Sequence, residues 1–148
     1  MKTYTTNINK LKLVREDSGI KKVKISSSLD SQEFARKFYH DDITIYESFF
    51  LILLNNANNT TGYVKISQGG ITGTIVDVRI LAKYAIEALC TSVILVHNHP
   101  SGTLKPSQSD KTITIKVQDA LGLFDIKVLD HIILTEHLYF SFADENLL

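Results

Sequence analysis

Two histidines, separated by one residue at the end of an apolar run, are well suited to bind a metal ion together. His97 and His99 follow residues 93–96, four β-prone apolar residues that predict a buried strand. Side chains two positions apart in an extended chain leave it on the same side. Both imidazoles should therefore meet above one strand end.

A carboxylate, Asp110, is expected to join them from the start of a helix. Pro106 and Ser107 form a turn signal, and Ser107 has the residue type of an N-cap whose hydroxyl accepts the backbone amide of Asp110. The helix macrodipole favours a carboxylate in this first turn. Two imidazoles and one carboxylate suit a borderline divalent cation, Zn²⁺ first, and leave a fourth tetrahedral position open, as catalytic sites do. The competing interpretation is two ordinary loop histidines and a helix-start acid, because His-x-His alone is a weak signal.

The whole string resembles a known signature. His97-x-His99, seven residues, Ser107, two residues and Asp110 are similar to the JAMM motif of JAB/MPN metallopeptidase domains. The HNHPSG and PSQSD spellings, and DHIIL at 130–134, resemble the RadC branch, historically named for DNA repair. The resemblance implies that both histidines and Asp110 bind zinc, that Ser107 orients or stabilises the oxyanion, and that an upstream glutamate is the general acid/base. Glu47, which precedes the run SFFLILL at 48–54, matches that glutamate in type and setting.

The resemblance also implies the architecture. It predicts an α/β fold of the α+β type: a single JAB1/MPN-like, cytidine-deaminase-like three-layer domain in which helices flank a mixed β-sheet. Residues 41–148 would form the RadC-like JAB/MPN domain. Residues 1–40 would add a strand and a helix to the same globule, without the helix-hairpin-helix module that precedes the domain in full-length members.

Apolar periodicity predicts the elements that must position these groups. Asp77 is a candidate N-cap, and Gly122 is a candidate helix end. The expected elements are strand 21–26, helix 31–40, strand 43–55, returning strand 63–68, helix 77–90, strand 93–96, helix 107–122, strand 126–135 and strand 139–142.

Asp130 and His131 interrupt the apolar strand 126–135. Neighbours in a strand face opposite sides, so at most one of the two faces the core or the site. One of them is a candidate for holding a ligand imidazole in its tautomer.

Composition limits the partners. The 148 residues suffice for one domain, and 44% apolar content supports a core. Sixteen basic and sixteen acidic residues give no net charge, which argues modestly against binding to duplex DNA or anionic lipid.

The single cysteine excludes an internal disulfide. The start lacks a signal-peptide core and the longest apolar run, 49–54, is too short to span a bilayer, so we expect a cytoplasmic protein without membrane contact.

The JAMM resemblance implies a zinc-dependent metallohydrolase that cleaves a peptide or isopeptide with a metal-activated water. Its partner would then be a peptide or protein substrate, although motif residues do not say what enters the groove. Two alternatives stay open. One is a non-catalytic MPN scaffold or binding module, and the other is a DNA-repair-associated RadC-like protein that acts on or binds DNA.

Overall fold

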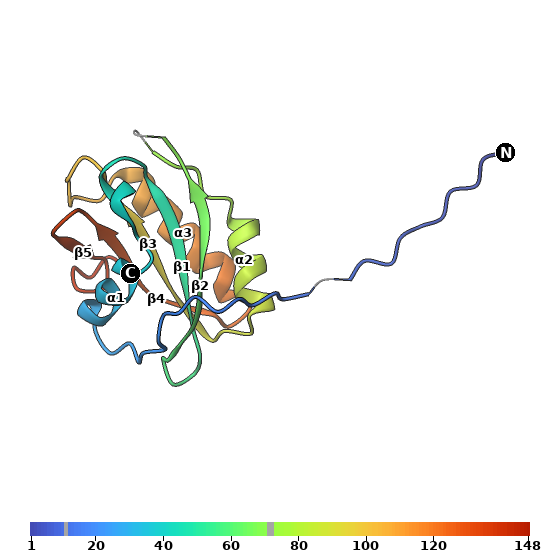
Figure 1. The fold of residues 1–148 in the computed structure, drawn as a ribbon, viewed down its shortest axis with the longest axis horizontal. Coiled ribbons are helices and arrows are strands. Elements are labelled where there is room, and N and C mark those ends of the chain that lie inside the picture. Colours follow the sequence, from blue (N-terminus) through green and yellow to red (C-terminus); the bar gives the residue numbers. More distant parts are fainter. Residues whose placement is uncertain (11, 71–72) are drawn as a thin grey trace.

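A mixed β-sheet is the centre of the computed structural model, which describes residues 1–10, 12–70 and 73–148. The five strands found in these residues lie in the order β2-β1-β3-β4-β5, with α-helices on both faces (Figure 1). The elements are α1 (Ser28–Arg36), a 3-10 helix η1 (Asp41–Thr44), β1 (Ser48–Leu54), β2 (Thr60–Gln68), α2 (Val78–Glu87), β3 (Ser92–Asn98), α3 (Gln108–Gly122), β4 (Lys127–Leu134) and β5 (Tyr139–Ser141).

The strand pairing makes β3 a central strand. β1 pairs antiparallel with both β2 and β3, whereas β3 and β4 are parallel and are joined by α3. β5 returns antiparallel to β4. This mixed sheet with flanking helices confirms the predicted α/β fold.

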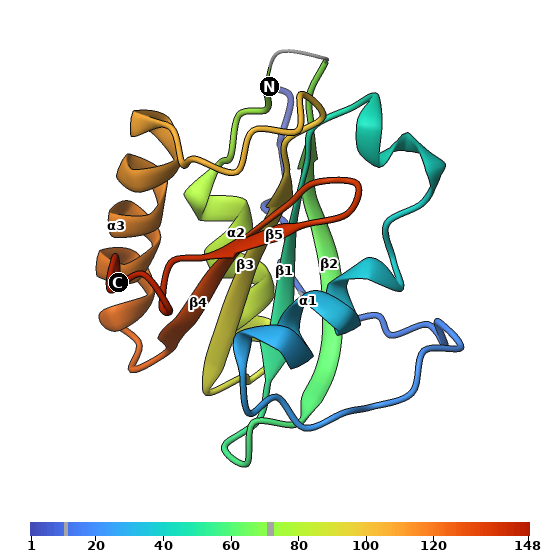
Figure 2. The same cartoon turned by 90° about the vertical axis from the view of Figure 1, so that its left-hand side faces the viewer.

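Every residue of β1 and of β3 is buried, because the sheet is covered on both faces. Alternate side chains enter opposite cores. Leu51 and Leu95 belong to the core that includes residues of α2 and α3, and Ile52 and Ile94 belong to the core that includes residues of α1. Figure 2 shows α1 in front of the sheet and α2 behind it. Full burial of one such side chain contributes about 1.5–3 kcal/mol. Packing against the two cores therefore fixes the register of the strand pairs, and with it the direction in which the residues at the strand ends point.

Each α-helix begins at a side-chain cap: Ser27 for α1, Asp77 for α2 and Ser107 for α3. The cap at Ser27 explains why α1 starts earlier than the predicted 31–40; the helix also ends earlier, at Arg36. The predicted strand 21–26 is wrong, since this segment makes only an isolated bridge, from Lys24 to Asn59. In the described ranges, no helix is both long and apolar enough to cross a membrane.

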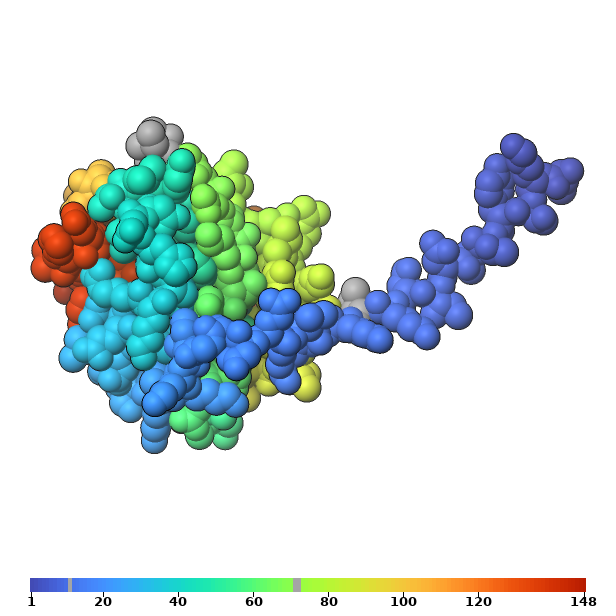
Figure 3. Space-filling view, viewed as in Figure 1, coloured from blue at the N-terminus to red at the C-terminus, as the bar shows by residue number. Residues whose placement is uncertain are grey.

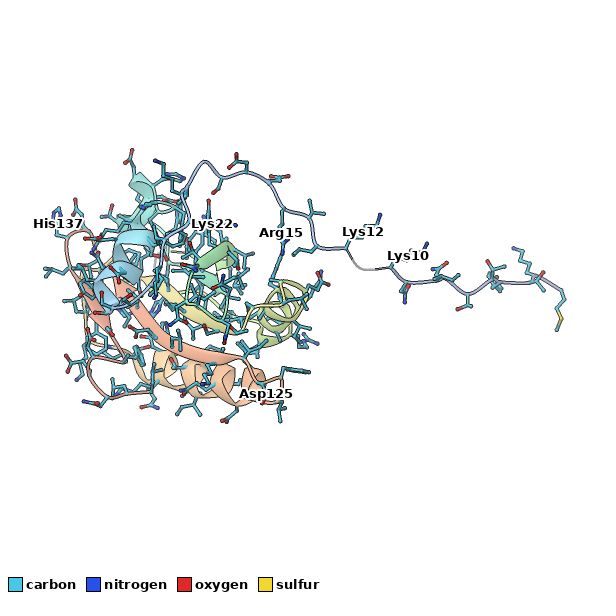
Figure 4. The ribbon with its side chains drawn as sticks, turned by 90° about the horizontal axis from the view of Figure 1, so that it is seen from below. Lys10, Lys12, Arg15, Lys22, Asp125 and His137 are labelled. Atoms are coloured by element: carbon cyan, nitrogen blue, oxygen red, sulfur yellow. The ribbon has the colours of Figure 1, made fainter. Side chains whose placement is uncertain are left out.

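The N-terminal segment lies outside the folded domain. Residues 1–10 and 12–17 are exposed and have no regular structure, and the space-filling view shows the segment extending away from the globule (Figure 3). Lys10, Lys12 and Arg15 lie along it (Figure 4). His137 lies on the β4–β5 turn with its side chain 81% exposed. Neither region contributes to the candidate site.

Candidate metal centre

Four groups meet at the end of the central strands. Glu47, His97, His99 and Asp110 each offer one ligand atom, and these atoms all lie within 4.8 Å of one another. The Nε2 atoms of the two histidines are 2.9 Å apart. The carboxylate of Asp110 contacts His97 Nε2 at 3.1 Å and His99 Nε2 at 3.3 Å. The structure thus brings the expected carboxylates and imidazoles together.

His99 presents a lone pair to this cluster. It follows the last residue of β3, and its backbone N–H donates to the Leu134 carbonyl at 2.8 Å. Its Nδ1 lies 2.7 Å from the carbonyl of Thr103. A carbonyl only accepts, so Nδ1 carries the proton and Nε2 of the neutral ring is free to bind a cation.

Asp110 is held at the start of α3 by a capping box. The Ser107 hydroxyl accepts from the Asp110 amide at 3.0 Å, and the Asp110 carboxylate accepts from the Ser107 amide at 2.7 Å. Burial alone would raise the pKa of Asp110, but the adjoining imidazoles of His97 and His99 outweigh burial and hold the pKa far below its usual value. Asp110 is therefore ionised. For His99, burial alone would lower the pKa, but the Asp110 carboxylate and the Thr103 carbonyl raise the pKa overall.

Glu47 lies one residue before β1 and is half-buried. Its backbone is tied to the end of β2 because its carbonyl accepts from Gly69 N at 2.8 Å and its amide donates to Gly70 O at 3.3 Å. The β1–β2 register shifts between Phe49 and Phe50, an irregularity of the kind found beside active sites. Burial raises the pKa of Glu47, against the opposing effect of His97 and His99. A raised pKa suits a group that must both take and give a proton.

Asn98, which the sequence analysis did not single out, positions the segment around Glu47. It points away from the two histidines and is fully buried. Its Oδ1 accepts from Ser48 N at 2.8 Å, and its Nδ2 donates to the carbonyls of Ile43 and Tyr46, both at 2.7 Å. One amide thus holds the backbone on both sides of Glu47. The sequence did offer one signal for this role: Asn98 is a polar residue at an inward-facing position that directly follows buried strand residues.

The structure separates the two candidates on β4. His131 faces the site, with Nε2 2.8 Å from His97 Nδ1. Complete burial holds the pKa of His131 well below its usual value, so this ring is neutral. Asp130 faces the C-terminal segment, where it accepts from Ser141 Oγ at 2.7 Å and Ala143 N at 3.0 Å. Burial raises its pKa. Asp130 therefore holds the end of the chain, and only His131 contacts a candidate ligand.

A cavity of about 1080 Å³ adjoins the four groups. Ser107 lies exposed on its wall, and the hydrogen of its hydroxyl is not used in the capping box. The wall mixes apolar and polar side chains; besides the four groups it includes Phe49, Ile75, Val76, Ile113, Thr103, Lys105, Ser109, Thr112 and Lys116. The cluster is thus accessible to a ligand larger than water.

The donor set fits a divalent cation. Two imidazole nitrogens that both present lone pairs repel each other at 2.9 Å unless a cation or a proton lies between them. The adjoining carboxylates supply the negative charge that a cation needs. This group of His97, His99, Asp110 and Glu47 can therefore bind a metal ion.

An α/β domain with a mixed sheet and a Glu-His-His-Asp group at its strand ends has the features of the JAB/MPN class. The model of the RadC-like JAB domain matches residues 25–147, so the chain belongs to this family.

Its curated relatives carry a common name. The chain is 44% identical over 133 residues to a UPF0758 protein of Flavobacterium johnsoniae, covering 90% of this chain and 57% of that protein. It is 41% identical over 103 residues to a UPF0758 protein of Porphyromonas gingivalis, covering 69% and 45%. It is 42% identical over 102 residues to the UPF0758 protein YfjY of Escherichia coli, covering 69% and 64%. The chain thus spans about half the length of the curated relatives it matches.

Proposed function

We propose that the protein is a JAMM-type zinc metallohydrolase that cleaves an amide bond of a peptide or isopeptide. The observation that carries this proposal is the convergence of Glu47, His97, His99 and Asp110 within 4.8 Å beside an accessible cavity. The family match and the JAMM spacing support it.

His97 Nε2, His99 Nε2 and the Asp110 carboxylate would hold the zinc ion. Three protein ligands of these types are characteristic of catalytic zinc, which keeps one position open. When bound, zinc supplies Lewis-acid polarisation of a carbonyl and lowers the pKa of water toward 7.

Glu47 acts as the proton carrier. Its carboxylate takes a proton from the attacking water as the water oxygen bonds to the amide carbon. It passes that proton to the nitrogen of the leaving amine as the C–N bond breaks, so atoms and charge balance over the step. Its half-buried position favours this exchange because desolvation raises its pKa toward that of the groups it serves.

Ser107, on the wall of the same cavity, would stabilise the oxyanion. Its hydroxyl oxygen accepts from Asp110 N, which leaves the O–H hydrogen to donate to the developing oxyanion. The capping box holds this hydroxyl in place before substrate arrives, so little reorganisation is needed.

The test is a peptide-substrate profile of the zinc-loaded protein and its Glu47→Gln variant. Loss of the proton carrier should lower kcat about 10²–10⁴-fold while zinc content stays unchanged. Glu136→Gln is the matched control because Glu136 is exposed on the β4–β5 turn. Equal hydrolysis by the Glu47→Gln variant and the parent would remove Glu47 from the mechanism.

Two outcomes would replace the proposal. Zinc binding without hydrolysis of any substrate in the profile would indicate a scaffold or binding module. Metal-dependent nicking of plasmid DNA, abolished by His99→Ala, would assign the site to nucleic acid.

A further inference from the structure

A buried chain of hydrogen bonds lies behind His97 and connects it to a second candidate ligand. His97 Nδ1 contacts His131 Nε2 at 2.8 Å, and His131 Nδ1 contacts Thr114 Oγ1 at 2.6 Å. Thr114 Oγ1 donates in turn to the backbone carbonyl of Asp110 at 2.6 Å. We propose that His131 and Thr114 are positioning residues that keep the proton of His97 on Nδ1, which leaves Nε2 free for the metal. This inference rests on the proposed metal centre and concerns how the chain prepares it.

The direction of donation follows from the one member that cannot donate. The Asp110 carbonyl only accepts, so the hydroxyl hydrogen of Thr114 points to it. The Thr114 oxygen must then accept from His131 Nδ1–H. A neutral imidazole protonated on Nδ1 has a lone pair on Nε2, which accepts from His97 Nδ1–H. The outer nitrogen of His97 is left with a lone pair that faces His99 and Asp110.

Burial makes this arrangement the favoured one. His131 is 0% exposed, and His97 and Thr114 are each 1% exposed, so water does not replace a missing partner. The ring of Phe142 stacks on His131 with centroids 4.6 Å apart, and Phe49 stacks on His97 at 5.9 Å. These contacts hold both rings in the plane that the hydrogen bonds require, and an unpaired buried donor would be costly.

The relay also links two secondary-structure elements that carry ligands. His97 belongs to β3, Asp110 and Thr114 belong to α3, and His131 on β4 bridges them. A ligand imidazole whose other nitrogen is fixed by a partner binds metal more tightly, and loss of that partner typically costs 10 to 100-fold in affinity. Thr114 gave no such signal in the sequence, because its partner is distant and a threonine within a helix usually bonds only to its own helix.

Thr114→Val is the variant that tests the relay, and Thr114→Ser is its matched control. Valine keeps the shape of threonine and removes the hydroxyl, whereas serine keeps the hydroxyl. Zinc affinity is measured by competition with a chromophoric chelator. The protonated ring nitrogen of each histidine is read from long-range proton–nitrogen correlation spectra of the metal-free protein.

In Thr114→Val, His131 Nδ1 has no acceptor, so its proton moves to Nε2 and donates to His97 Nδ1. His97 must then carry its own proton on Nε2, which zinc has to displace. We expect zinc affinity to fall about 10 to 100-fold, with the tautomers of His97 and His131 both reversed. Thr114→Ser should keep the parent's tautomers and affinity.

Parent-like affinity and parent-like tautomers in Thr114→Val would overturn the inference. So would spectra of the unmutated protein that place the His97 proton on Nε2, a result that does not depend on any variant folding. A parent protein that binds zinc but cleaves nothing would count against the proposed hydrolase and leave the relay standing, since neither readout requires turnover.

Discussion

Replacement of Asn98 should separate catalysis from metal binding. Asn98→Ala removes one acceptor for Ser48 N and two donors to the carbonyls of Ile43 and Tyr46. These are the hydrogen bonds that hold the backbone on both sides of Glu47. The side chain points away from His97 and His99, so it contributes nothing directly to their ligand atoms.

The magnitude follows from the three lost hydrogen bonds. At about 1 kcal/mol net for each, Asn98→Ala should lower the free energy of unfolding by about 3 kcal/mol. For a chain of this size, that corresponds to a fall in Tm of about 6–12 °C. Displacement of Glu47 by even about 1 Å should lower kcat about 10²-fold.

Three measurements check this: thermal unfolding, zinc affinity and kcat below the unfolding transition. Asn98→Asp is the partner variant, because it keeps an acceptor for Ser48 N and replaces the donors by an oxygen that faces two carbonyls. It should lower kcat with the zinc site retained. Parent-like kcat in a destabilised Asn98→Ala would show that Asn98 supports only the fold, and loss of zinc in both variants would refute the separation.

Three further substitutions test other parts of the site. Ser107→Ala should lower the free energy of unfolding, measured with denaturant, by about 0.5–2 kcal/mol because the N-cap is lost. Because the hydroxyl is proposed to stabilise the oxyanion, kcat should also fall more than KM changes. An unchanged kcat would limit the role of Ser107 to capping the helix. Gly69→Ala should cost about 1–3 kcal/mol through overpacking and lower kcat, because its Cβ would lie 1.7 Å from the Gly73 carbonyl oxygen. Gly70→Ala, whose Cβ would meet no atom of the described residues within 4 Å, is its control, and equal effects would contradict the steric reasoning. Asp130→Ala should lower the free energy of unfolding by about 1–3 kcal/mol for each buried donor left unpaired. Its zinc affinity should fall less than that of Thr114→Val. The reverse order would show that Asp130, and not Thr114, supports the metal ligands.

Local rules in the sequence account for much of the candidate site. The two-residue period of an extended strand places His97 and His99 on one side, and the spacing of Ser107 and Asp110 is that of the capping box seen at α3. Because these relations span only a few residues, no knowledge of the tertiary fold was needed.

Contacts between distant segments could not be predicted in the same way. Asn98 bonds to residues 50 or more positions earlier, and Thr114 meets His131 across the gap between α3 and β4. The parallel pairing of β3 with β4 likewise depends on how the chain crosses over, which periodicity does not specify. The predicted strand 21–26 was wrong. Its alternation of polar and apolar residues reflects the burial of Ile25, but among the described residues the segment has no continuous partner strand and forms only an isolated bridge.

The metal content of the purified protein is the decisive test of the candidate metal centre. Inductively coupled plasma analysis of the zinc-loaded, desalted chain should give about one zinc ion per chain, as a site with three protein ligands retains it. His97→Ala and Asp110→Ala should each lose that zinc, whereas Glu47→Gln should keep it. Absence of zinc from the parent, or equal zinc in the His97→Ala variant, would contradict the proposed metal centre.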